Sequence, residues 1–232
     1  MKNTNSEVQL QATMQVKICG MTSASELRLL DRSGVDFAGI WFNVPSGRYS
    51  LNKEQFVALA RTPLSQLKCI GVTTESNPDI IAQYVRESGV MGVQLQGFQL
   101  PKEVSFIKRR LPDHVSLLKV LHIQKGKCLE RPLLLEYANC GADAFILDNF
   151  ISREQSGSTG QRIPTSTVLE LINSFGTDRL FLAGGMDEEG IRYVRSQIPL
   201  RGVDIDTGAR IASQINGDRV RNIVSAARDI IN

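Results

Sequence analysis

Residues 180–208 read LFLAGGMDEEGIRYVRSQIPLRGVDIDTG and contain one full repeat of the pattern that decides the fold. The apolar run Leu180–Ala183 is followed by a segment with helical spacing that begins near Asp187, and then by a second apolar run, Gly202–Ile205. Continuous apolar runs are typical of strands that are buried on both faces, as in parallel sheets covered by helices. The stretch therefore predicts a parallel strand–helix–strand unit.

This pattern recurs along the rest of the chain and gives eight predicted strands. They are Val16–Cys19, Phe37–Phe42, Leu67–Val72, Gly92–Leu95, Val115–Leu121, Ala144–Leu147, Leu180–Ala183 and Gly202–Ile205. Helices are expected to begin near Ser23, Asn52, Asn77, Pro101, Leu129, Pro164, Asp187 and Gly217, several of which are residue types that cap helices.

Eight such units without a linker favour an α/β fold with a single closed (β/α)₈ TIM barrel over residues 16–232. Residues 1–15 are polar and are expected to form a flexible N-terminal extension. An open dinucleotide-binding sheet is the alternative, but the turn after the first strand reads Cys19-Gly20-Met21-Thr22 instead of GxGxxG.

The bulk composition argues against several classes of partner. The 27 Lys and Arg residues are interspersed with 24 Asp and Glu, so the net charge of +3 provides no basic stripe for nucleic acid. No apolar run approaches the roughly 18 residues that a membrane span needs. The four cysteines lack CxxC spacing, and the two histidines provide little material for a metal site or a Ser-His-Asp triad. We therefore expect no metal, no membrane or nucleic-acid partner, and a reduced, cytoplasmic setting.

Glycine-bearing turns follow the last three predicted strands. They read Gly157-Ser158-Thr159-Gly160, Gly184-Gly185 and Thr207-Gly208. Backbone N–H groups can approach a phosphate where no side chain blocks them, and barrels commonly bind phosphate with the loops after strands seven and eight. Each turn alone could be a plain turn, but their order along the chain predicts a phosphate site.

Two ionisable side chains are expected to face each other across the mouth of the barrel, because the chemistry of such barrels lies just past the strands. Cys19 ends the first strand, and Asp148 follows the sixth. Together they could act as base and acid on one substrate. The simpler alternatives are a buried small hydrophobic residue for Cys19 and a cap or turn residue for Asp148. Arg48 could pair with a carboxylate or phosphate, or lie on the surface, while Trp41 is expected in the core.

The order of these motifs resembles the phosphoribosylanthranilate isomerase family, whose members are (β/α)₈ barrels of the ribulose-phosphate-binding type. Val16-Lys17-Ile18-Cys19-Gly20-Met21-Thr22 is close to the family's VKICGIT, and Arg48-Tyr49 matches the end of its KSxRY segment. Supporting matches are Gly92–Leu95, Ile146–Asp148, Leu182–Gly185 and Gly202–Asp204. The likeness runs from Val16 to about Arg228.

This resemblance implies an Amadori rearrangement of a phosphorylated aminosugar, with Cys19 as general base and Asp148 as general acid. It implies substrate-binding roles for Arg48, Gln94, Asp204 and Arg210. No cofactor is expected, because the protonated imine is itself the electron sink. A cysteine base also requires a nearby cation or helix N-terminus that favours the thiolate. The protein could act as a monomer or a homodimer.

Three departures from the family pattern keep other functions open. Gln96 replaces the histidine of QLHG, residues 157–164 lose the end of GGxGxxFDW, and DVSSGVE becomes Asp204-Ile205-Asp206-Thr207-Gly208-Ala209-Arg210. Asp206 places a carboxylate near the expected phosphate, and Arg210 is a cation that could compensate it. The alternatives are a divergent paralogue that acts on another aminoaldose phosphate, and a non-catalytic barrel that binds a sugar phosphate.

Overall fold

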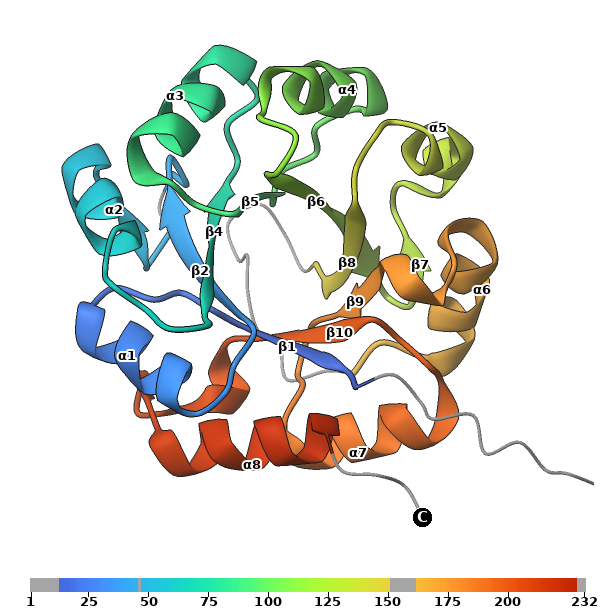
Figure 1. Ribbon diagram of the computed structural model, residues 1–232. Helices are drawn as coiled ribbons and strands as arrows, with labels where there is room; N and C mark the ends of the chain where they lie inside the picture. Colours follow the sequence, from blue (N-terminus) through green and yellow to red (C-terminus); the bar gives the residue numbers. More distant parts are fainter. Residues whose placement is uncertain (1–12, 46, 151–161, 229–232) are drawn as a thin grey trace, which may run out of the picture.

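The computed structural model describes residues 13–45, 47–150 and 162–228, and it confirms the (β/α)₈ barrel (Figure 1). Neighbouring barrel strands pair in parallel, and the last strand pairs with the first, which closes the sheet. The barrel strands are β1 (Gln15–Cys19), β2 (Phe37–Phe42), β4 (Lys68–Thr73), β5 (Gly92–Leu95), β6 (Ser116–Gln124), β8 (Ala144–Asn149), β9 (Leu180–Leu182) and β10 (Gly202–Ile205). Three additional short pairings involve β3 (Ser50–Leu51) with β2, β7 (Lys127–Cys128) with β6, and β11 (Arg210–Ile211) with β12 (Gln214–Ile215).

Helices surround the sheet as an outer ring, as Figure 1 shows. They are α1 (Ala24–Arg32), α2 (Lys53–Ala60), α3 (Pro78–Ser88), α4 (Pro101–Arg110), α5 (Leu134–Ala138), α6 (Thr165–Phe175), α7 (Glu188–Gln197) and α8 (Gly217–Arg228). Short 3₁₀ turns span Arg131–Leu133, Thr177–Arg179 and Thr207–Ala209. Side chains cap four of the helix starts expected from the sequence, at Ser23, Asn52, Asn77 and Asp187. Each accepts a hydrogen bond from a backbone N–H of the first turn, which would otherwise lack a partner.

Alternate side chains of each strand face opposite sides of the sheet. In β6, Leu118 and Val120 belong to a small cluster built almost entirely from strand residues, whereas Leu117 and Leu121 belong to the large cluster that joins the sheet to the helices. The same alternation separates Ala144 and Ile146 of β8 from their neighbours. The small cluster therefore fills the barrel interior. The interior-facing series, made of every second residue of a strand, continues to the carboxyl end of that strand.

The differences from the expected element bounds lie at the ends of elements. β6 runs on to Gln124 and β8 to Asn149, because both strands continue pairing past their apolar runs. The helix expected near Leu129 is short and begins with a 3₁₀ turn at Arg131. β1 begins at Gln15, one residue before the expected domain boundary, and residues 1–12 of the expected extension lie outside the described residues. No helix in the described ranges is both long and apolar enough to cross a membrane.

Candidate active site

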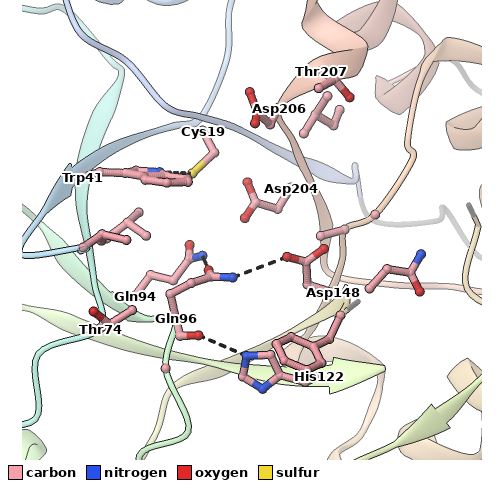
Figure 2. Close-up of a pocket in the computed structure, with 18 of the residues that line it drawn as sticks. Cys19, Trp41, Thr74, Gln94, Gln96, His122, Asp148, Asp204, Asp206 and Thr207 are labelled. Carbon is pink, nitrogen blue, oxygen red and sulfur yellow. Dashed lines mark hydrogen bonds between the residues drawn. The ribbon is translucent and has the colours of Figure 1, made fainter. Parts of the chain in front are cut away.

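A cavity of about 310 Å³ opens at the carboxyl ends of the barrel strands. All eight barrel strands, or the loops directly after them, contribute to its wall. The polar side chains of that wall include Cys19, Arg48, Thr74, Gln94, Gln96, His122, Asp148, Asn149, Asp204, Asp206 and Thr207. Many of them continue the interior-facing series of their strand, so the period of the sheet aims them into one space. Figure 2 shows Cys19 and Trp41 on one side of this space and Asp148 on another.

Cys19 lies on the cavity wall and is only 7% exposed. The indole N–H of Trp41 donates a hydrogen bond to Sγ at 3.0 Å (Figure 2). Burial raises the pKa of the Cys19 thiol to about 11, although Lys17 and the Trp41 hydrogen bond act in the opposite direction. The expected cation is therefore present, but the thiol is neutral in the ligand-free protein because burial outweighs it. Trp41 is only partly buried and lines the cavity, so its expected place in the core was wrong.

Lys17 and Asp204 form a buried ion pair beside Cys19. The ammonium of Lys17 is 2.9 and 3.0 Å from the two carboxylate oxygens of Asp204. Gly39 of β2 leaves room for this arrangement, because a Cβ there would lie 2.7 Å from the sulfur of Cys19 and 3.0 Å from the nitrogen of Lys17. Burial disfavours the ammonium, but Asp204 and Cys19 raise the pKa of Lys17 overall. Asp204 lines the cavity with its carboxylate already held by this lysine.

Asp148 continues the interior-facing series of β8 and lies opposite His122 of β6 in the sheet register. Burial, together with the nearby carboxylate of Asp204, raises the pKa of Asp148 to about 6. The charge of His122 and a hydrogen bond from Gln96 limit the rise. A carboxyl group with such a pKa carries a proton in a useful fraction of molecules near neutral pH, as a general acid requires.

The glycine turns after β9 and β10 also reach the cavity. Gly184 and Gly185 have φ of 78° and 65°, and both line it with Thr207 and Gly208. A Cβ at Gly184 would lie 2.8 Å from the side-chain nitrogen of Asn149, so a larger residue there would have to displace this side chain. The turn Gly157-Ser158-Thr159-Gly160 lies outside the described residues.

Arg48, Asp206 and Arg210 form one chain of charges at the rim. A guanidinium nitrogen of Arg48 is 2.5 Å from Asp206, and Nε of Arg210 donates to the other oxygen of the same carboxylate at 2.9 Å. Arg48 is 51% exposed and lines the cavity. Arg210 is buried and is absent from the described cavity wall; its Nη2 donates to the carbonyl oxygens of Cys19 and Gly20 at 3.1 and 2.7 Å. These contacts give Arg210 a structural role, and a direct contact between Arg210 and a ligand stays a prediction.

The sequence did not lead us to expect a role for His122 or for its partner Glu130. Nδ1 of His122 is 2.5 Å from a carboxylate oxygen of Glu130, and its Nε2 is 3.0 Å from the carbonyl oxygen of Gln96. His122 stacks on Phe98 with ring centroids 4.0 Å apart. The available signal was the period of two, since His122 is two residues beyond the interior-facing Val120. Among the described residues, no group of three or more His, Cys, Asp or Glu is arranged to hold a metal ion.

A family model described as N-(5'phosphoribosyl)anthranilate (PRA) isomerase matches residues 16–226. The chain belongs to this family. Among curated relatives, the PRA isomerase of Nostoc punctiforme is 31% identical over 205 residues, which cover 86% of this chain and 90% of the relative. The PRA isomerase of Acetivibrio thermocellus is 24% identical over 218 residues, covering 92% of this chain and 95% of the relative. The PRA isomerase family resemblance inferred from the motifs is thereby confirmed.

Solved structures of PRA isomerases share the fold. The enzyme from Thermotoga maritima gives a TM-score of 0.78 at 21% identity, covering 92% of this chain and 98% of that one. The enzyme from Thermus thermophilus gives 0.75 at 21% identity with the same coverage. A further Thermotoga maritima structure, described as monomers generated from the dimeric isomerase, gives 0.75 at 20% identity, again over 92% of this chain and 98% of that one.

Proposed function

We propose that this protein catalyses the Amadori rearrangement of N-(5'-phosphoribosyl)anthranilate to 1-(2-carboxyphenylamino)-1-deoxyribulose 5-phosphate, a step of tryptophan biosynthesis, in the cytoplasm. The observation that carries the proposal is that Cys19 and Asp148 line one cavity with the glycine turns after β9 and β10. Family membership points to the same reaction. A PRA isomerase structure with 21% identity and a TM-score of 0.73, covering 92% of this chain and 98% of that one, holds reduced 1-(o-carboxyphenylamino)-1-deoxyribulose 5-phosphate.

Asp148 serves as the general acid of the first step. Its carboxyl group donates a proton to the furanose ring oxygen, the C1–O bond breaks, and the nitrogen lone pair forms the protonated imine. Because the pKa of Asp148 is about 6, the proton is available near neutral pH and is still acidic enough to transfer.

Cys19 serves as the base of the second step. It removes the proton from C2, the C2–H electrons form the enolamine, and tautomerisation gives the ketose. The neutral thiol of the free protein must first give its proton to water, and two cations favour this loss: Lys17, which is already in place, and the protonated imine that forms beside the sulfur. Formation of the protonated imine thus favours the thiolate that then removes the C2 proton of this intermediate.

Different walls of the cavity bind the two anionic ends of the substrate, which are the phosphate and the anthranilate carboxylate. Peptide N–H groups of Gly184, Gly185 and Gly208 approach the phosphate, together with Thr207, and the turn Gly157–Gly160, outside the described residues, is assigned to the same end. The exposed guanidinium of Arg48 pairs with the anthranilate carboxylate. Asp206 and Glu26 balance the charges of Arg48 and Arg210, so it is the exposure of the Arg48 guanidinium, and not a net positive charge, that lets this rim hold an anion.

Gln94 and Asp204 complete the assigned substrate contacts. Oε1 of Gln94 is buried without a hydrogen-bond partner in the described part of the chain, so it offers an acceptor to a ribose hydroxyl or to the substrate amine. Asp204 lies between Lys17 and the cavity, where its carboxylate faces the reacting carbons.

Purified protein mixed with freshly generated phosphoribosylanthranilate tests the proposal. We expect the fluorescence of this substrate to fall with enzyme-dependent kinetics and the ketose phosphate to accumulate. A protein that binds the substrate without turning it over would favour a sugar-phosphate sensor. Turnover of another N-glycosyl amine phosphate alone would favour a divergent paralogue.

The phosphate assignment is tested by Gly184→Val. A β-branched side chain is strained at φ 78° and collides with Asn149, so the turn must move and the affinity for a phosphorylated product analogue should fall at least about tenfold. Isothermal titration calorimetry measures this affinity. Gly89→Val is the matched control, because Gly89 has φ 73° at the end of α3, a Cβ there would lie in open space, and the residue does not line the cavity. Equal affinities of the Gly184 variant and the wild type would refute the assignment.

A further inference from the structure

The side chain of Gln96 is fixed by contacts at both of its polar atoms. Its Oε1 accepts a hydrogen bond from Nε2 of Gln94 at 2.7 Å, and its own Nε2 donates to Oδ2 of Asp148 at 3.4 Å (Figure 2). The Gln94 amide also donates to the carboxylate of Asp204, so it presents its nitrogen on this side, and only the oxygen of Gln96 can accept it. The nitrogen of Gln96 is consequently turned toward Asp148.

The main chain of Gln96 is anchored as well. Its N–H donates to the carbonyl oxygen of Thr73 at 2.8 Å, and its own carbonyl oxygen lies 3.0 Å from Nε2 of His122. The ring of His122 cannot turn freely, since Glu130 holds Nδ1 at 2.5 Å and Phe98 stacks on its face. Both ring nitrogens face acceptors, which the imidazolium form satisfies by donating twice. The Glu130–His122 pair therefore holds the main chain of Gln96 in place.

We propose that Gln96 is a positioning residue that fixes the acidic proton of Asp148 on Oδ1. Oδ2 accepts the amide N–H of Gln96 in both protonation states, so a proton on Oδ2 would face another donor and lose this hydrogen bond. The proposal rests on the proposed function, because only a carboxyl group that acts as an acid needs its proton on one particular oxygen.

The same contacts connect substrate binding to the acid. The only amide atom of Gln94 without a partner in the described ranges is Oε1, on the cavity wall. A substrate donor that binds Oε1 extends a chain of hydrogen bonds through the two glutamine amides to Asp148, and each bond in such a chain polarises the next. Binding thus strengthens the hydrogen bond to Oδ2, which stabilises the carboxylate left behind after the proton is transferred.

The charged groups that act on Asp148 come from other strands of the barrel and stay in place when Gln96 is replaced. Asp204 of β10, with Lys17 of β1 beside it, raises the pKa of Asp148, while His122 of β6, paired with Glu130, lowers it. A change in the titration of Asp148 after substitution of Gln96 can therefore be assigned to the lost amide hydrogen bond.

Gln96→Leu tests the proposal, with Gln96→His as the variant that keeps a ring N–H donor and Gln83→Leu, on the exposed face of α3, as a distant control. Three quantities are measured: the pKa of Asp148 in the ligand-free protein, from the side-chain ¹³C carboxyl NMR shift, and kcat and KM for phosphoribosylanthranilate. Because a hydrogen bond to a carboxylate favours the charged form, we expect Gln96→Leu to raise this pKa by about 0.5–1 unit. We expect kcat to fall about tenfold with KM changed less than about twofold, because the orientation of the acid proton affects its transfer in the reaction and not the binding of substrate.

Each outcome decides a different step. An Asp148 pKa that is the same in Gln96→Leu and the wild type overturns the positioning role, even if activity falls through altered folding. A pKa that rises in Gln96→Leu but returns with Gln96→His, together with recovery of kcat, supports it. A wild-type protein that does not convert phosphoribosylanthranilate overturns the proposed function and the acid role with it, whereas the titration still reports whether the hydrogen bond exists.

Discussion

Asp148→Asn should lower kcat/KM by about 10²–10⁴-fold and, at pH 8, make the folded protein more stable by about 2 kcal/mol. The activity falls because an amide has no acidic proton for the ring oxygen. The stability rises because the wild type must keep an ionised carboxylate in a buried site at this pH. Burial and Asp204 raise the pKa of Asp148 to about 6 in the folded protein, well above its value in an unfolded chain.

The sign of the stability change follows from this shift. A carboxyl group whose pKa is raised by folding destabilises the folded state above that pKa, and this penalty fades as the pH falls toward the unfolded pKa of about 4. Urea unfolding of both proteins at pH 8 and pH 4 should therefore show a gain at pH 8 that disappears at pH 4. Asp113→Asn, at an exposed position in the loop before β6, should change neither activity nor stability. A gain of equal size at both pH values would contradict the assigned ionisation.

Cys19→Ser should separate the base from the acid. Activity should fall strongly, because a hydroxyl group is a far weaker acid than a thiol and gives almost no anion to remove the C2 proton. The pH-dependent stability gain of Asp148→Asn should be absent, since the pKa of Cys19 is about 11 and the thiol is neutral throughout the range from pH 4 to 8. Steady-state assays and the same urea series measure both effects. Full activity in this variant would exclude the thiol as the base.

The fold, and the positions of Cys19, Asp148 and the glycine turns in the site, follow from local patterns in the sequence. Strand and helix alternation predicts the barrel, since the apolar runs recur at regular spacing and several of the helix starts carry a capping residue such as Ser23 or Asn52. Cys19, Asp148 and the glycine pairs could be placed at the cavity because they follow directly after the runs. In a barrel all such positions meet at one end, so no knowledge of pairing register is needed.

The remaining features depend on contacts between residues that are far apart in the chain. The Lys17–Asp204 pair spans 187 residues, and Arg210 reaches Cys19 across 191. Whether a charge swap at residues 206 and 210 blocks the anion site depends on two residues elsewhere in the chain: Arg48, which pairs with Asp206, and Glu26, which lies 3.7 Å from Arg210. The raised pKa of Cys19 also depends on how far water is excluded, which no local motif encodes.

Lys17→Met should cost about 3–5 kcal/mol of stability at pH 8, because it removes the partner of a buried carboxylate. The ammonium of Lys17 is fully buried, and Asp204 is 7% exposed, so water cannot replace the lost contact. Equilibrium urea unfolding measures the loss. The deficit should shrink as the pH falls, since the pKa of Asp204, already raised by burial, rises further without Lys17 and the carboxyl group becomes neutral.

The Lys17→Met/Asp204→Asn double variant should recover much of this loss, because no unpaired charge then remains in the interior. Lys53→Met is the surface control: Lys53 is 33% exposed, its partner Glu87 is 40% exposed, and loss of such a pair should cost far less than loss of the buried one. If the double variant were as unstable as Lys17→Met, the penalty would come from lost packing of the lysine stem and not from the uncompensated carboxylate. The pair would then contribute to stability through packing, and the charge of Lys17 would act only on the neighbouring Cys19 thiol.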